Sequence, residues 1–521
     1  MCIIKSLAKS IVVVVVSASL PLLASAEPIT VELGSSGPGY SSPAIAEIDG
    51  NLNNGKEIVV TSANGIVSVV LGDGTVLWEK ALPTNSCTSL SGNNRAHSSP
   101  AVGALLGGTN QYVVVGYGGI AGTACGGGVV AFNGPDGTEA WRFDLKQFAK
   151  RRRLFAISHS VFSSPTLFDI DQDGTLEVVF GSLDRNIYML SASGRLKGFY
   201  HAADTVFSSA AVADTNGDAS PEIIIGTDIS KNTVINPPTP NGGYLYALKS
   251  SLFKRGAEIG FRKAGSAVWR AQFNQVVQSP PVVAELISAN SGKEVVVATG
   301  CYFPENTTNK RGRDVKVFSL ATGTLLRTLQ VPACTGAEPA VADVDGDGIN
   351  DVVIPVQGLS VYGGDGTSRV IAWNPDSNTT LWTTVPLVND HNSSTVGLFG
   401  GLVIADLDKN GSREVVVANG SGMTILAGAT GEHLSCEAAS CDDGRSSFTG
   451  FKGLKNAVAV ADLTGDGTLE LVVAGSLNRV GTLKIYTQLA TLITSSAGNN
   501  PNYTPWPMFR GGPLHTGVQV E

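Results

Sequence analysis

The stretch from Glu338 to Val356 reads EPAVADVDGDGINDVVIPV and decides the fold of this chain. It contains a short segment of small apolar residues, which we call the entry of the repeat, then a loop rich in aspartate and glycine, and then a run of β-branched residues. Aspartate and glycine favour tight turns, and β-branched residues favour strands. The stretch therefore predicts two short antiparallel strands joined by an acidic turn.

The same design recurs along the chain, which identifies it as a repeat. The other copies begin at Ser41, Ser98, Ser163, Ser208, Ser279, Gly401 and Asn456. After each copy comes a shorter alternating segment, and often one that carries tryptophan, such as VLWEK, AWRF or LWTT. Each repeat thus holds about four short strands, the content of one propeller blade. We predict an all-β fold, a β-propeller with eight blades of four antiparallel strands; the alternative is seven blades plus an irregular unit.

The last repeat ends at Tyr486 without a tryptophan-bearing strand. An open array would leave sheet edges unpaired, so a terminal segment is expected to complete this blade. The candidates are residues 28–33 and residues 505–509. We therefore interpret residues 27–521 as a single propeller closed by terminal segments.

Residues 1–26 have the pattern of a signal peptide. Lys5 and Lys9 precede an apolar run from Ile11 to Leu23, and Ala24-Ser25-Ala26 resembles a cleavage site. The prediction is an exported protein that is secreted, periplasmic or on the cell surface, with no transmembrane anchor after cleavage. Disulfides are expected there, and proximity in sequence favours three pairs. These are Cys87 with Cys125, Cys301 with Cys334, and Cys436 with Cys441.

The formal net charge is -8, which gives no basic surface for phosphates. We therefore predict no nucleic-acid partner. The strongest basic run, Lys150 to Arg153, is interpreted as a solvated loop between blades.

Five of the acidic loops carry oxygen-bearing side chains at loop positions 1, 3, 5 and 9. The sets are Asp169, Asp171, Asp173 and Glu177; Asp214, Asn216, Asp218 and Glu222; Asp343, Asp345, Asp347 and Asp351; Asp406, Asp408, Asn410 and Glu414; and Asp462, Thr464, Asp466 and Glu470. Hard oxygen donors at this density suit Ca²⁺, which we predict as the cofactor. Position 12 lies in a strand and carries no glutamate, so these loops are not EF-hands. The competing interpretation is that they are only hairpin turns.

Position 6 of these loops is glycine except at Ala219, as a sharp turn requires. Three repeats depart from the ligand pattern. In the first repeat, Glu47 and Asp49 are present, but an insertion displaces Glu57. The loops after Gly103 and Glu285 lack the ligands. We expect these three loops to bind calcium weakly or not at all.

These loops resemble FG-GAP/VCBS repeats, the family that includes integrin-α-type propellers and many bacterial surface proteins. The resemblance covers nearly the whole mature chain. It implies calcium in the loop between the first two strands of a blade, and a role in adhesion, ligand binding or assembly. The Gly-Ala-Pro triplet of the family is mostly replaced here by GSL, GTD or GSG, which puts integrin-like ligand recognition in doubt. The expected partner is a protein or glycan bound on a propeller face.

We find no catalytic motif, so the chain is predicted to be a binding module without catalytic residues. Two enzyme classes remain as alternatives. The tryptophan-bearing segments resemble those of eight-bladed quinone-dependent dehydrogenases, and a polysaccharide lyase could be built on a calcium propeller. His97 and His159 stand near strand entries, where they could form an acid/base or metal pair, although ordinary loop histidines are the simpler interpretation. The sequence does not identify the ligand.

Overall fold

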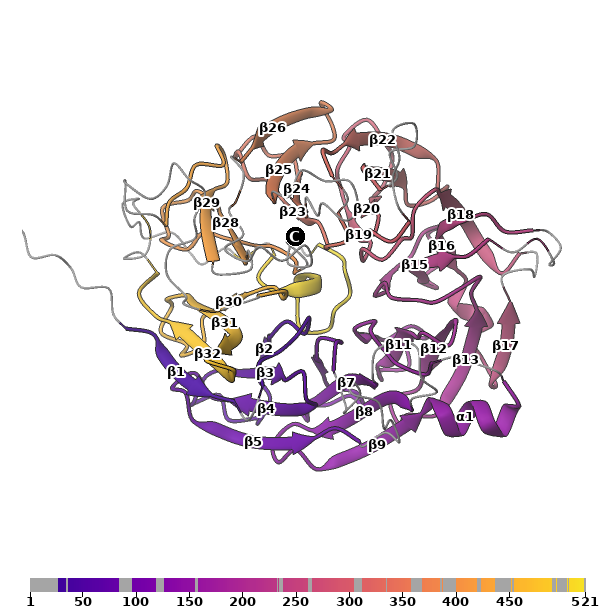
Figure 1. Ribbon diagram of the computed structural model, residues 1–521, viewed down its shortest axis with the longest axis horizontal. Coiled ribbons are helices and arrows are strands. Elements are labelled where there is room, and N and C mark those ends of the chain that lie inside the picture. Colours follow the sequence, from indigo (N-terminus) through magenta and orange to yellow (C-terminus); the bar gives the residue numbers. More distant parts are fainter. Residues whose placement is uncertain are drawn as a thin grey trace, which may run out of the picture.

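Eight small antiparallel sheets surround a central axis and form an eight-bladed propeller (Figure 1), which confirms the predicted fold class. The structure is a computed structural model. It describes residues 27–33, 36–83, 96–118, 126–154, 158–231, 233, 238–260, 265–303, 312–333, 335–357, 368–384, 387, 400–418, 423–435, 451, 454–489, 493, 504 and 506–519. The first strands of successive blades contact one another around the ring, and the first strand of blade eight contacts that of blade one. The ring is therefore closed.

The strands of a blade follow one another outward from the axis. Blade one contains β2 (Ala44–Ala46), β3 (Glu57–Thr61), β4 (Ile66–Val70) and β5 (Val76–Ala81). Blade two contains β6 (Ala101–Gly103), β7 (Tyr112–Gly118), β8 (Gly127–Asn133) and β9 (Glu139–Asp144). Blade three contains β10 (Thr166–Phe168), β11 (Glu177–Gly181), β12 (Asn186–Leu190) and β13 (Leu196–His201). Blade four contains β14 (Ala211–Ala213), β15 (Glu222–Ile229), β16 (Gly242–Leu248) and β18 (Ala267–Phe273).

The second half of the chain continues the series. Blade five contains β19 (Val282–Ala284), β20 (Glu294–Ala298), β21 (Asp314–Ser319) and β22 (Leu325–Gln330). Blade six contains β23 (Ala340–Ala342), β24 (Asp351–Val356), β25 (Arg369–Asn374) and β26 (Thr379–Thr383). The described strands of blade seven are β27 (Val403–Ala405), β28 (Glu414–Ala418) and β29 (Met423–Ala427). Blade eight contains β30 (Ala459–Ala461), β31 (Glu470–Leu477), β32 (Val480–Tyr486) and β1 (Ile29–Glu32).

Strand β1 completes the last blade by pairing antiparallel with β32. This is the first of the two expected closures. A second seam runs close to the channel, where the Ser42 hydroxyl accepts a hydrogen bond from the Ala457 backbone. Equivalent hydrogen bonds link the entries of neighbouring blades within the ring. The Ser42 backbone amide donates to the Ser99 hydroxyl, and the Ser99 backbone amide donates to the Ser164 hydroxyl. The repeated Ser-Ser-Pro sequence therefore ties blade to blade.

Hydrophobic cores lie between neighbouring sheets. The second strand of each blade is sandwiched between two neighbours, and β3, β11 and β20 are accordingly buried along their whole length. The fourth strands are at the rim, where β5 and β22 alternate or are half-exposed. This gradient explains why the second strands read as unbroken β-branched runs.

Tryptophans on the outer strands bind each blade to the next. Their indole nitrogens donate to backbone carbonyls of the following blade at 2.6–2.8 Å. The four pairs are Trp78 with Gly134, Trp141 with Ala192, Trp269 with Leu320, and Trp382 with Gly428. Each indole also covers a turn glycine, and a Cβ there would come within about 2.6 Å of the ring. These four tryptophans therefore pack each blade against the next.

Two elements differ from expectation. The basic run is not a loop, because Lys150, Arg151 and Arg152 form the last turn of helix α1 (Leu145–Arg152). Three cations suit this end of a helix, which carries partial negative charge. Strand β17 (Ala257–Gly260) comes from the long excursion between β16 and β18 and adds a fifth, parallel strand to blade three. In the described part of the chain, no helix is long and apolar enough to cross a membrane.

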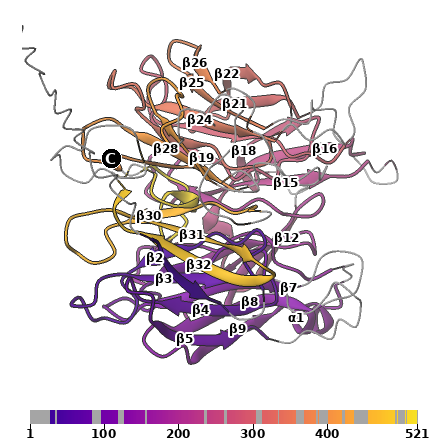
Figure 2. The ribbon, with the colours of Figure 1, turned by 60° about the vertical axis from the view of Figure 1, so that its left-hand side comes forward.

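The C-terminal segment fills the centre of the ring (Figures 1 and 2), where it contains the short 3-10 helix η4 (Phe509–Gly511). It runs past one blade after another and accepts backbone hydrogen bonds from their first strands. The donor and acceptor pairs are Ile404 and Trp506, Val460 and Pro507, Val102 and Pro513, Leu167 and Leu514, Val212 and Thr516, and Val283 and Gly517. Trp506 was expected against the last blade, but it packs in the core of blades five to seven.

Arg510 anchors this segment at the axis. Its side chain is fully buried, and its Nη1 lies 2.7 Å from Glu338 Oε1 and 2.9 Å from the Pro281 carbonyl. Its Nη2 also donates to the Ala210 carbonyl. The guanidinium thus joins the entries of blades four, five and six. A buried charge needs such paired partners to be tolerated.

Candidate functional site

The five predicted ligand loops each connect the first strand of a blade to the second. Because consecutive strands are antiparallel, these connections all lie at the same end of the propeller. In blade six, for example, the loop joins β23 to β24. Backbone geometry agrees with the expected turn, since Gly174, Gly348, Gly411 and Gly467 all have positive φ angles. Ala219 takes the same conformation at φ 62°.

One hydrogen-bond pattern is shared by all five loops. The carboxylate at position 1 accepts from backbone amides at positions 4 to 6, as Asp343 does from Gly346 and Gly348. The side chain at position 5 accepts from the amide of position 7, as Asp347 does from Ile349. These are the bonds of an Asx-type turn. The residues therefore do form turns, and the same bonds hold their remaining oxygens in place.

The carboxylate at position 9 closes each loop from the start of the second strand. One of its oxygens accepts from the backbone amide of position 2 at 2.7–3.1 Å. The donors are Ile170, Thr215, Val344, Leu407 and Leu463, for Glu177, Glu222, Asp351, Glu414 and Glu470 respectively. This fixes the orientation of a buried carboxylate and leaves its second oxygen for another partner.

Three of the predicted loops bring carboxylate oxygens within 4.8 Å of one another. The groups are Asp169, Asp171 and Glu177; Asp343, Asp345 and Asp347; and Asp406, Asp408 and Glu414. Ligand distances to Ca²⁺ of about 2.4 Å allow two ligands to lie at most about 4.8 Å apart. The spacing of these groups is therefore compatible with one central cation.

Some predicted ligands lie outside these groups. Asp173 and Asp351 do not belong to the triads of their own loops. Among the described residues, the loops that begin at Asp214 and Asp462 form no such triad. Both have a neutral side chain at position 3, Asn216 and Thr464, whereas all three triads of the predicted loops include a carboxylate at position 3.

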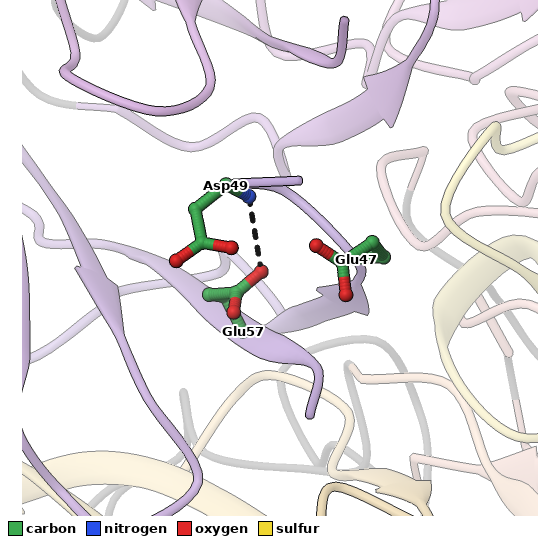
Figure 3. A group of neighbouring side chains, drawn as sticks. All are labelled: Glu47, Asp49 and Glu57. Carbon is green, nitrogen blue, oxygen red and sulfur yellow. Dashed lines mark hydrogen bonds between the residues drawn. The ribbon is translucent and has the colours of Figure 1, made fainter. Parts of the chain in front are cut away.

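The loop of blade one was expected to lack a complete ligand set, but it forms a triad. Glu47, Asp49 and Glu57 bring their oxygens within 4.8 Å of one another (Figure 3). The inserted residues lengthen the turn and still return Glu57 to the position that Glu177 or Glu414 occupies elsewhere. Glu57 Oε2 accepts from the amides of Ile48 and Asp49. The signal that could have found this site is the position of Glu57 at the start of its strand.

Two loops satisfy the closing carboxylate without an ion. In blade three, the ammonium of Lys197 lies between Asp171 and Glu177 and is 2.8 Å from Glu177 Oε1. In blade five, Glu294 accepts from the Leu286 amide and also from the side-chain amide of Asn290. Lys197 and Asn290 therefore donate to the second oxygen of the closing carboxylate in these two loops.

Burial raises the pKa of the closing carboxylates, and neighbouring acidic groups raise it further. The pKa rises to about 7 for Glu57 and Asp351, and to about 8 for Glu414. Glu57 Oε1 and Asp351 Oδ1 are buried oxygens without a hydrogen-bond partner. Unsatisfied buried oxygens in a cage of carboxylates fit a hard divalent cation such as Ca²⁺.

Each of the two histidines has a described partner of its own. His97 stacks on Phe162 with ring centroids 4.3 Å apart. His159 Nδ1 lies 3.7 Å from Asp184 Oδ2.

Five of the six predicted disulfide cysteines lie outside the described residues, as do residues 1–26, so the cysteine pairing and the signal peptide stay predictions.

No family model and no curated protein matches the sequence. Among solved structures, the fold is similar to BamB from Moraxella catarrhalis, with 12% identity, a TM-score of 0.50, and coverage of 89% of this chain and 100% of that one. It is also similar to quinohemoprotein alcohol dehydrogenase from Comamonas testosteroni, with 13% identity, a TM-score of 0.53, and coverage of 91% and 77%. A third similar structure is the exotype rhamnogalacturonan lyase YesX, with 15% identity, a TM-score of 0.50, and coverage of 94% of this chain and 80% of that one. At such identities these likenesses establish the propeller fold alone.

Proposed function

We propose that this protein is an exported, calcium-binding propeller of the FG-GAP/VCBS type that works as a binding, adhesion or scaffolding module. The observation that carries the proposal is the gathering of carboxylate oxygens within 4.8 Å of one another in three of the five acidic loops and in the loop of blade one. Two closing carboxylates of these loops also have a buried oxygen without a hydrogen-bond partner, Glu57 Oε1 and Asp351 Oδ1. A cation would compensate their burial.

Calcium is expected to stabilise the fold because it binds the native loops and not the unfolded chain. Each site contributes about 2.7 kcal/mol when calcium is present at 100 times its dissociation constant. Excess chelator should therefore lower the melting temperature, and metal analysis of the purified protein should find calcium. An unchanged melting curve together with absence of calcium would show that the loops are only turns.

Asp345→Ala tests one loop directly. Asp345 is an exposed member of the blade-six triad, so its loss should weaken calcium binding while leaving the core intact. We expect reduced stability in calcium and little change in chelator. The matched control is Asp73→Ala, because Asp73 is an exposed turn aspartate that accepts from the Thr75 amide and belongs to no triad. That variant should lose the same small amount in both buffers; the same behaviour from Asp345→Ala would contradict a metal role.

The enzyme alternatives are weaker proposals. The tryptophans that resemble those of quinone-dependent dehydrogenases have a packing role in this fold. The centre of the ring contains the Arg510–Glu338 pair. We therefore place the ligand on a face of the propeller, and we propose a protein or a glycan as the partner.

Export is tested by sequencing the mature N-terminus, which should begin near Glu27.

A further inference from the structure

A cleft of about 330 Å³ lies at the end of the propeller opposite the acidic loops. Its walls are the connections that follow second and fourth strands, which in antiparallel blades lie at the other end from the first connection. Blade three contributes the turn around Asp184 and the exit around Asp204, and blade four contributes the end of β15 around Asp228. Tyr302 and Phe303 of blade five complete the rim.

The charges of the lining residues are unbalanced. Three carboxylates, those of Asp184, Asp204 and Asp228, face a single guanidinium, that of Arg185. Asp184 accepts a hydrogen bond from the Tyr188 hydroxyl at 2.7 Å. Asp204 pairs with Arg185 at 3.3 Å and accepts from the Thr205 amide. Two of the three carboxylates are therefore compensated within the protein.

Asp228 is the exception. Its Oδ2 accepts from the Thr205 hydroxyl at 2.9 Å and from the Gln278 side-chain amide at 3.5 Å, whereas its Oδ1 is buried and has no hydrogen-bond partner. The residue is only 8% exposed, yet it lines the cleft. Burial, and then the charge of Asp204, raise the pKa of Asp228 to about 7. Such an oxygen is satisfied best by a donor that also brings positive charge.

Aromatic rings form the apolar part of the cleft. Phe207 packs edge-on against Phe162 with centroids 5.2 Å apart, so its position is fixed. Tyr302 is 62% exposed and packs against Phe303. An exposed aromatic ring in a cleft that is also lined by carboxylates is a favourable surface for an organic cation and for the flat face of a sugar ring. The side-chain amide of Gln278, whose Nε2 already donates to Asp228 Oδ2, also lines the cleft.

We propose that this cleft binds a hexosamine residue with a free ammonium group. The ammonium would meet Asp228 Oδ1, and the ring would lie against the aromatic rim. The excess of carboxylates disfavours uronic acids, and the aromatic rings of the rim offer the flat face of a sugar ring more contact area than a lysine side chain would use. The inference rests on the proposed role as a ligand-binding module and narrows the ligand to an amino sugar.

Calorimetric titration of the mature, calcium-loaded chain with a chitosan tetramer tests the proposal. The N-acetylated tetramer of the same length is the matched ligand, because acetylation removes the charge, replaces the ammonium by an amide with its methyl group, and keeps the same sugar backbone. A hydrogen bond to a charged group corresponds to about 10- to 100-fold in affinity, so we expect the free amine to bind at least tenfold more tightly. Equal binding of the two tetramers would overturn the proposal. Tighter binding of pentalysine than of chitosan would overturn the choice of a sugar.

Asp228→Asn keeps the shape of the side chain and removes its charge. We expect it to abolish the preference for the free amine, whereas Asp73→Asn at an exposed turn of blade one should preserve the preference. Melting curves of both variants check folding. If the amine preference is absent while the unaltered protein still binds calcium, the ligand assignment fails and the proposed calcium module stands. If calcium binding is also absent, the proposed function fails with it.

Discussion

The acidic loops of blades three and seven have the same hydrogen-bond pattern but differ in what balances their charge. In blade three, Lys197 places an ammonium between two carboxylates of the loop. In blade seven, Asp406, Asp408 and Glu414 are all buried, and Lys409 points to the neighbouring loop, where it donates to the Gly467 carbonyl. Burial and the two aspartates raise the pKa of Glu414 to about 8.

The difference shows that a shared loop sequence does not determine how strongly a loop binds Ca²⁺. A loop that already holds an ammonium gains less from Ca²⁺, because the ion must displace a cation that the protein supplies. The three carboxylates of the blade-seven loop are all buried, so the cost of their desolvation favours a bound divalent cation more strongly. We therefore expect calcium affinity to be higher in blade seven than in blade three.

Removing one ligand from each loop should give the largest contrast. Asp408→Ala should lose about 2–3 kcal/mol of unfolding free energy in saturating calcium and much less in chelator, because it abolishes a stabilising site. Asp171→Ala should lose about 1 kcal/mol or less under the same conditions, since the ammonium already satisfies that loop. Chemical denaturation with and without calcium measures both. Equal calcium-dependent losses would break the comparison.

The repeat itself explains why the fold could be predicted. Each copy contains its own strand run, turn and entry, so local chemistry specifies a blade. The closure by β1 was one of two predicted options because the last repeat visibly lacked a strand. The turn of the five loops was equally predictable, since glycine at position 6 of four loops, a carboxylate at position 1 and an Asp or Asn at position 5 act within a few residues.

The features that escaped prediction depend on contacts between distant residues. Lys197 lies 26 positions from Asp171, and nothing near either residue indicates that they meet. The path of the C-terminal segment is likewise set by strands from six blades. Strand β17 joins a sheet of the preceding blade, and a local pattern cannot show which sheet a strand will join. The site of blade one was missed because spacing was counted along the chain, while Glu57 is placed by its strand.

Lys197→Met should make the loop of blade three behave like that of blade seven. Without the ammonium, Asp171 and Glu177 lose their partner, so the variant should be less stable than the parent in chelator by about 1 kcal/mol. In calcium the same change should raise the affinity of this loop by roughly tenfold, because the ion no longer competes with an internal cation. Lys80→Met is the matched control at an outer strand. A loss of the same size in both buffers would mean that Lys197 does not occupy an ion site.

Ala219→Gly should have the smallest effect and separates backbone strain from charge. Ala219 holds φ 62°, where an L-residue with a Cβ is strained by about 1–2 kcal/mol and glycine is not. Part of that gain is offset because glycine makes the unfolded chain more flexible, so we expect a net stabilisation of roughly 0.5–1 kcal/mol. The gain should be the same in calcium and in chelator, since the loop geometry is already that of its glycine-bearing counterparts. Ala213→Gly, in strand β14 of the same blade, should instead lose stability by a similar amount. A gain that appears only in calcium would show that the alanine distorts the ion site, and the ranking of loops by charge alone would then be wrong.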